Sequence, residues 1–124
     1  MSQAFSIKKM SVQFVVKDIE QSIQYYTTVL GFSLEFRYED FYAGVVLGDC
    51  SIHLKTVDPS PEERTSKRVT ESLDILISVE GIEALFETLS SRSVLFTQVL
   101  RTMPYGKEFY LADPDGYIIA FVES

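Results

Sequence analysis

The side chain with the widest range of chemistry in this sequence is His53, the only histidine among 124 residues. It falls in an apolar stretch with strand-like alternation, so its ring is expected to share a face with Ser51 and Lys55. An imidazole there could act as a general base or as a metal ligand near neutral pH. It could equally be a hydrogen-bonded wall residue of a cavity. The sequence leaves both interpretations open.

The single cysteine, Cys50, lies close to His53 in the same predicted strand. The odd separation of the two residues places the sulfur on the face opposite the imidazole, so we expect no Cys–His nucleophilic pair. Cys50 is predicted to pack as a small apolar side chain. A chain with one cysteine forms no internal disulfide, which is typical of a reducing compartment. We therefore expect a cytoplasmic protein.

Composition argues against several classes of partner. The chain carries 11 basic and 18 acidic side chains, a net charge of −7. An acidic domain repels phosphate backbones, so no nucleic-acid partner is expected, whereas a cationic ligand would be tolerated. No apolar run approaches the length of a membrane span, so no membrane partner is expected either. The 6 glycines are scattered among turns and form no phosphate-binding loop.

The elements that position His53 begin with a strand and a helix. Val12–Val16 is a β-branched apolar run, and Asp18 follows it as a helix N-cap. Apolar residues then recur at helical spacing as far as Leu30, and Gly31 stands where a helix C′ residue belongs. Three further strands are predicted at Ser33–Tyr38, Tyr42–Leu47 and Cys50–Val57.

The same unit occurs again at a constant offset along the chain. Val16 corresponds to Val79 (79 − 16 = 63), and the helical stripe after it is repeated with similar spacing. Strands are predicted at Ile75–Val79, Leu95–Arg101, Glu108–Ala112 and Tyr117–Glu123. The sequence therefore predicts a single α+β domain, residues 1–124, of two βαβββ modules. Module 1 covers about 8–57, module 2 about 71–124, and the polar residues 58–70 connect them.

Several motifs in this order resemble one known family. They are Val16-Lys-Asp-Ile-Glu20 with Tyr25-Tyr26, Val29-Leu-Gly-Phe32, Pro104-Tyr-Gly-Lys-Glu-Phe-Tyr110 and Asp113-Pro-Asp-Gly-Tyr117. Their spacing across a duplicated module is similar to the vicinal oxygen chelate superfamily, which includes glyoxalase I, extradiol dioxygenases and bleomycin-resistance proteins. The resemblance implies an open, curved sheet around a cavity with the helices outside. The Pro-Tyr-Gly segment resembles most the metal-poor, bleomycin-resistance-like branch.

The resemblance also implies where a metal would be held. Metal-dependent relatives place ligands at four cavity positions, which correspond here to Ser11, His53, Asp74 and Ala120. Catalytic divalent metals usually take three imidazole or carboxylate ligands. Only His53 and Asp74 are of these types, so we expect no metal ion and no other cofactor.

Strand parity and the resemblance together predict a ligand-binding face. Alternation turns Phe14 and Val16 towards the helices and Gln13 towards the cavity. Tyr105 borders the expected cavity, and Glu108 is the carboxylate best placed to replace the one missing at Ala120. The predicted ligand-binding residues are Ser11, Gln13, His53, Asp74, Tyr105, Glu108 and Ala120.

Two functions are compatible with these residues. The first is a metal-independent protein, similar to bleomycin-resistance proteins, that sequesters a cationic or aromatic small molecule. Aromatic rings would supply stacking surface, and Asp74 and Glu108 would favour a cation. The alternative is a metal-dependent enzyme of glyoxalase or dioxygenase type that uses His53 and Asp74. Since such proteins commonly complete their pockets across subunits, a homodimer is expected. The identity of the ligand does not follow from the sequence.

Overall fold

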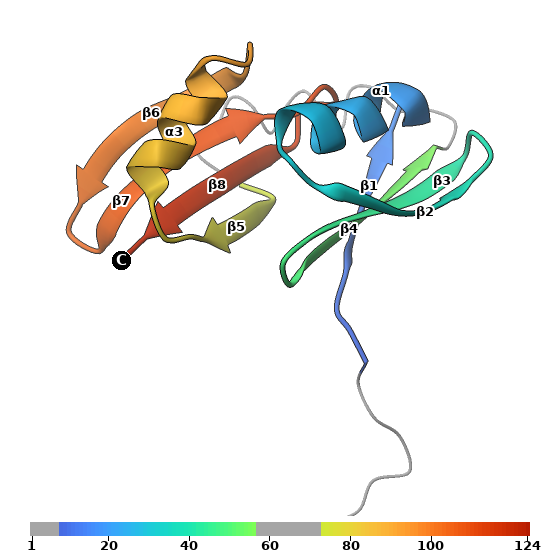
Figure 1. The fold of residues 1–124 in the computed structure, drawn as a ribbon, viewed down its shortest axis with the longest axis horizontal. Coiled ribbons are helices and arrows are strands. Elements are labelled where there is room, and N and C mark those ends of the chain that lie inside the picture. The colour runs from blue at the N-terminus through green and yellow to red at the C-terminus, as the bar shows by residue number, and fades with distance from the viewer. Residues whose placement is uncertain (1–7, 57–72) are drawn as a thin grey trace, which may run out of the picture.

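The computed structural model describes residues 8–56 and 73–124, which form two four-stranded sheets (Figure 1). The first sheet contains, in spatial order, β1 (Val12–Val16), β4 (Cys50–Thr56), β3 (Tyr42–Leu47) and β2 (Ser33–Tyr38). The second contains β5 (Ile75–Ser78), β8 (Ile118–Glu123), β7 (Gly106–Ala112) and β6 (Leu95–Met103). In each sheet the first and last strands of the module pair in parallel, and the other pairs are antiparallel. The predicted α+β fold of two βαβββ modules is confirmed; Val57 and the predicted connector lie outside the described residues.

The helix of the first module begins where the sequence predicts. α1 (Ile19–Gln24) is capped by Asp18, whose Oδ1 accepts the N–H of Gln21 at 3.1 Å. The segment then widens into the π-helix η1 (Tyr25–Val29) and does not continue as the single α-helix that the apolar spacing predicted. Gly31 ends it in the left-handed region at φ 85°, as expected of a C′ glycine. No helix in the described residues is long and apolar enough to cross a membrane.

The helix of the second module is capped from a strand. α3 (Ile82–Ser90) starts after Gly81, which has no side chain to accept a hydrogen bond. The carboxylate of Glu123, at the end of β8, accepts the N–H of Gly81 at 3.2 Å and that of Ile82 at 3.0 Å. These bonds hold the pKa of Glu123 below its usual value. The side chain of Glu123 therefore lies on the helix side of the second sheet.

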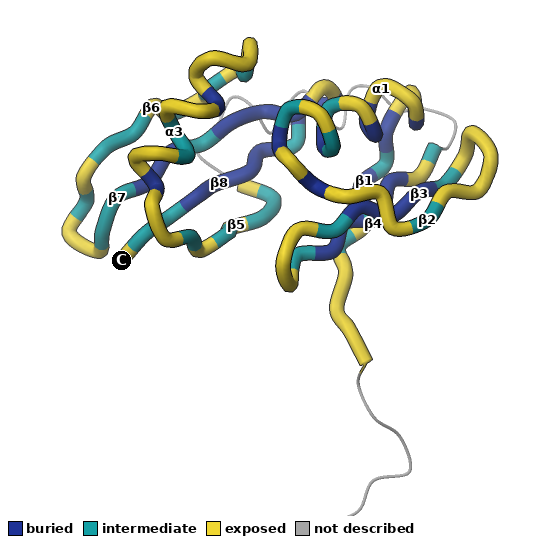
Figure 2. Tube along the Cα trace, viewed as in Figure 1, coloured by how far each residue is buried: buried dark blue, intermediate teal, exposed yellow. Residues whose placement is uncertain are grey.

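Each sheet buries the face that lies under its helix (Figure 2). On β1, Phe14 and Val16 are at most 5% exposed, whereas Gln13, which precedes Phe14, is exposed and Val15 between them is half-buried, so the predicted alternation is confirmed. On β5, Ile75 and Ile77 pack against the core, while Leu76 is 57% exposed. We call the two helix-free faces the first open face and the second open face.

The turn between β7 and β8 joins the two modules through a buried carboxylate. Asp113 accepts the N–H groups of Asp115 and Tyr117 on Oδ1, both at 2.9 Å, and the hydroxyl of Tyr26 on Oδ2 at 2.8 Å. Burial raises the pKa of Asp113 to about 6, and the nearby charge of Asp115 adds to that effect. The hydrogen bonds from Tyr26 and Tyr117 act in the opposite direction.

The same turn covers the free edge of β1. The ring of Tyr117 stacks on Phe14 with centroids 4.0 Å apart. Its hydroxyl accepts the N–H of Val15 at 2.9 Å and donates to the carbonyl of Val15 at 3.1 Å. Asp115 accepts the N–H of Lys17 at 2.9 Å. The second module thus satisfies backbone groups that an edge strand would otherwise leave unpaired.

We predict that Asp113→Asn changes how stability depends on pH. The folded pKa of Asp113, about 6, lies above its ordinary value of 3.8, so the folded state binds the proton more tightly. The stabilisation of the folded state by this bound proton is complete below about pH 4 and is lost as pH rises through 6. The change in the free energy of unfolding is about 3 kcal/mol.

Urea unfolding of both proteins from pH 4 to 7 measures this contribution as a difference. The stability of the wild type relative to Asp113→Asn should fall across that window. Asp49→Asn, at an exposed turn aspartate, is the matched control and should leave the profile unchanged. A difference between wild type and Asp113→Asn that is constant with pH would contradict the prediction.

Candidate functional site

The first open face carries a cluster of aromatic rings contributed by three strands. The ring of His53 meets those of Phe36 and Tyr42 edge-on, with centroids 5.1 and 5.4 Å apart. Tyr42 in turn stacks on Tyr38 with centroids 6.2 Å apart. We call Phe36, Tyr38, Tyr42 and His53 the aromatic cluster. Because Tyr38 is 57% exposed, one end of the cluster presents an aromatic surface to solvent.

A glycine and an irregular strand pair place Phe36 in this cluster. Gly44 lies opposite His53 in β4 and opposite Phe36 in β2. The register between β2 and β3 shifts between Leu34 and Phe36, which brings the ring over Gly44. A Cβ at Gly44 would collide with that ring. The missing side chain is therefore what allows Phe36 to lie on the sheet beside His53.

His53 is oriented by its neighbour on β3. The hydroxyl of Tyr42 forms a hydrogen bond with Nδ1 of His53 at 2.5 Å, which fixes the plane of the half-buried imidazole. Gln13 is the residue paired with His53 on β1, and Lys55 is paired with Tyr42 on β3. Both are exposed, so polar side chains border the cluster on the same face.

The second open face carries a different, internally satisfied group. Glu108 is 3% exposed and binds Arg101 through Nε at 2.8 Å and through a second guanidinium nitrogen at 2.6 Å. The hydroxyl of Tyr105 donates to its other oxygen at 2.6 Å, and the Arg101 guanidinium lies 5.8 Å from the ring centre of Tyr110. Burial acts to raise the pKa of Glu108, but the hydrogen bonds from Tyr105 and Arg101 outweigh it and hold the pKa below its usual value.

The residues predicted from the sequence fall into two groups. Ser11, Gln13 and His53 belong to the first module, and Asp74, Tyr105, Glu108 and Ala120 to the second. The hydroxyl of Ser11 is hydrogen-bonded to that of Ser51 at 2.7 Å. Oδ2 of Asp74 accepts the N–H of Ile118 at 2.8 Å, which ties the start of β5 to β8. Ala120 is fully buried in the middle of β8.

The sequence model of the Glyoxalase/Bleomycin resistance protein/Dioxygenase superfamily matches residues 10–121. The chain belongs to this superfamily. A comparison with curated proteins gives no match.

Several solved structures share the fold of this chain over almost its whole length. UcmS2 is 20% identical with a TM-score of 0.80, and the match covers 97% of this chain and 100% of that one. TnmS3, an antibiotic binding protein from Streptomyces sp. CB03234, is 23% identical with a TM-score of 0.72 and 98% coverage of both chains. The bleomycin-binding protein from Streptomyces verticillus, complexed with copper(II)-bleomycin, is 20% identical with a TM-score of 0.72, covering 97% of this chain and 98% of that one. At these identities the likeness establishes a shared fold.

The positions that hold the ion in metal-dependent superfamily members do not form a donor set in this chain. Ser11 is bonded to another hydroxyl, Asp74 is engaged by a backbone N–H, and Ala120 has no donor atom. Within residues 8–56 and 73–124, no three His, Cys, Asp or Glu side chains gather as a metal-binding group. The residues at these four positions therefore do not fit the metal site of metal-dependent superfamily members.

Sequence reasoning missed the ring partners of His53. The pattern Phe36-Arg-Tyr38 in a predicted strand places two rings on one face, and Tyr42 begins the next strand across a short turn. That signal was sufficient to predict an aromatic face. The register shift that aligns Phe36 with Gly44 had no such signal.

We predict that Gly44→Ala destabilises the protein by displacing the ring of Phe36. Forcing an extra carbon into this contact should lower the free energy of unfolding by about 1–3 kcal/mol. Urea unfolding of Gly44→Ala, Phe36→Leu and the double variant forms a mutant cycle. The penalty for alanine should be much smaller when Phe36 is leucine; equal penalties in both backgrounds would show that the ring is not the obstacle.

Proposed function

We propose that this protein binds a small planar aromatic compound on the aromatic cluster, without a metal ion, and acts by sequestering it. The observation that carries the proposal is the stack of Tyr38 on Tyr42, which continues into the core of the face through His53. A flat ligand can extend this stack at the exposed end, where Tyr38 already faces solvent.

The cluster is suited to binding because its rings are held in place before a ligand arrives. Tyr42 is fixed by its bond to His53, and Phe36 by its contact with Gly44. Preorganised rings lose little conformational freedom on binding, so more of the stacking energy contributes to affinity. Two proteins of the same fold, an antibiotic binding protein and a bleomycin-binding protein, bind small molecules, which supports a ligand-binding role.

We also propose that the protein is a homodimer. The second module exposes large apolar side chains: Leu76, Leu95 and Val99 are between 51% and 58% exposed, and Tyr105 is 53% exposed. Apolar surface of this kind is typical of protein–protein contacts. A second copy of the chain would bury it.

The binding proposal is tested by calorimetric titration with 1-pyrenemethanol, a flat neutral probe. Removing one stacking partner by Tyr38→Ala should weaken binding about five-fold. Phe41→Ala is the matched control, because Phe41 is also half-exposed and makes no ring contact within the described residues. Prior dialysis against EDTA should leave the affinity unchanged.

Three results would count against the proposal. They are no binding by the wild type, an equal loss in Tyr38→Ala and Phe41→Ala, and loss of binding after EDTA treatment that added Zn²⁺ or Ni²⁺ restores.

The dimer is tested by light scattering of the wild type and of Leu76→Lys. The wild type should show about twice the chain mass of 14.1 kDa, and a charge on the second open face should favour the monomer. Leu47→Lys is the control, because Leu47 is two residues from buried Val45 on β3 and so shares its face, the helix side of the first sheet. A monomeric wild type would exclude the dimer.

A further inference from the structure

The polar side chains that border the aromatic cluster have unused hydrogen-bonding capacity. Lys55 lies opposite Tyr42 in the register of β3 and β4, and its ammonium forms no ion pair or hydrogen bond within residues 8–56 and 73–124. Gln13 lies opposite His53, and its amide likewise has no partner in the described part of the chain. Because Nδ1 of His53 is occupied by Tyr42, the free imidazole nitrogen is Nε2.

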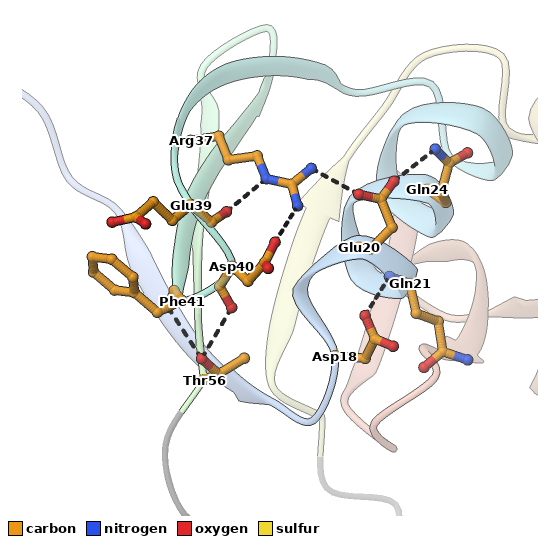
Figure 3. Close-up of polar contacts among 9 residues, drawn as sticks. All are labelled: Asp18, Glu20, Gln21, Gln24, Arg37, Glu39, Asp40, Phe41 and Thr56. Carbon is orange, nitrogen blue, oxygen red and sulfur yellow. Dashed lines mark hydrogen bonds and ion pairs between the residues drawn. The ribbon is translucent and has the colours of Figure 1, made fainter.

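Four carboxylates of the first module, those of Asp18, Glu20, Glu35 and Asp40, are engaged by other groups. Arg37 lies between Glu20 of α1 and Asp40 of the β2–β3 turn (Figure 3). Its guanidinium nitrogens are 2.8 Å from a carboxylate oxygen of Glu20 and 2.9 Å from one of Asp40. Asp18 caps α1 in the same view. Glu35 is bound by Lys9 at 2.8 Å. Although the whole chain has a net charge of −7, the charged side chain in the register of Tyr42 is a lysine.

The carboxylates that the sequence suggested as partners for a cation are also engaged. Glu108 is held by Arg101 and Tyr105 on the second open face. Asp74 accepts the backbone N–H of Ile118. Neither is a free negative charge beside the aromatic cluster, so the contacts favour the opposite ligand charge.

We propose that the ligand of the aromatic cluster is an aromatic compound bearing an anionic oxygen group, such as a carboxylate. This inference rests on the proposed function and names the ligand class. The planar body stacks at Tyr38, and the anionic oxygen lies at Lys55. Gln13 and the Nε2–H tautomer of His53 supply neutral donors to the same group.

The size of the charge effect follows from the position of Lys55. Its side chain is exposed, so an ion pair there is partly screened by water and adds only a modest gain to the stacking. We expect a preference of about five-fold for an anionic over a neutral ligand at low salt, which declines as ionic strength rises.

The test uses three probes with one ring system: 1-pyrenecarboxylate, 1-pyrenemethanol and 1-pyrenemethylammonium. Calorimetric titration at low salt should rank their affinities in that order. Lys55→Gln should remove the preference for the carboxylate and leave binding of 1-pyrenemethanol unchanged. Lys107→Gln is the charge-matched control, because Lys107 belongs to the second module and pairs there with exposed Glu83 of α3. It should keep the preference.

The outcomes separate this inference from the function on which it rests. If 1-pyrenemethanol binds but the carboxylate binds no more tightly, or Lys55→Gln keeps the preference, the anionic ligand class is wrong and aromatic binding stands. If the ammonium probe binds most tightly, the ligand class is cationic and the inference is overturned. If none of the three probes binds, the proposed function and this inference both fail.

Discussion

The architecture depends on burying one carboxylate between the two modules. Asp113 folds its own turn by accepting two backbone N–H groups, and with its remaining oxygen it holds Tyr26 of the first module. A single residue therefore shapes the β7–β8 turn and docks it. The π-helical segment contributes to the same contact, because Tyr25 and Tyr26 both reach the second module through their hydroxyls. A buried ionisable group is tolerated here because it has several hydrogen-bond donors.

With the modules joined in this way, each sheet has one face covered by a helix and one left open. The side chains on the two open faces make different kinds of contact. The second face ties its carboxylate to an arginine and a tyrosine, which leaves a surface of apolar side chains around a neutralised pair. On the first open face the aromatic rings contact one another, and Lys55 and Gln13 keep hydrogen-bond donors without partners in the described residues. Two proteins that share this fold bind an antibiotic or bleomycin; under the proposed function, Tyr38 and Lys55 would select the ligand of this chain.

Much of the fold could be predicted from the sequence because local signals and the repeat agree. The alternation of β1, the N-cap Asp18 and Gly31 each have a signal in neighbouring residues. The π-helical turn has none, since its apolar spacing reads as ordinary α-helix. The site was harder to predict. His53 was recognised by the chemistry of its side chain. The hydrogen bonds that engage the carboxylates of Asp74 and Glu108 come from residues on neighbouring strands. Residue spacing does not encode the register that brings those partners together.

The contact of Tyr117 with β1 protects the protein against aggregation. A tyrosine hydroxyl that bonds both backbone groups of Val15 seals part of a strand edge that could otherwise pair with another chain. If the turn withdrew, the first module would expose that edge together with Phe14, an aromatic side chain now covered by Tyr117. Separation of the modules would thus lead to intermolecular strand pairing and precipitation, not to two soluble halves.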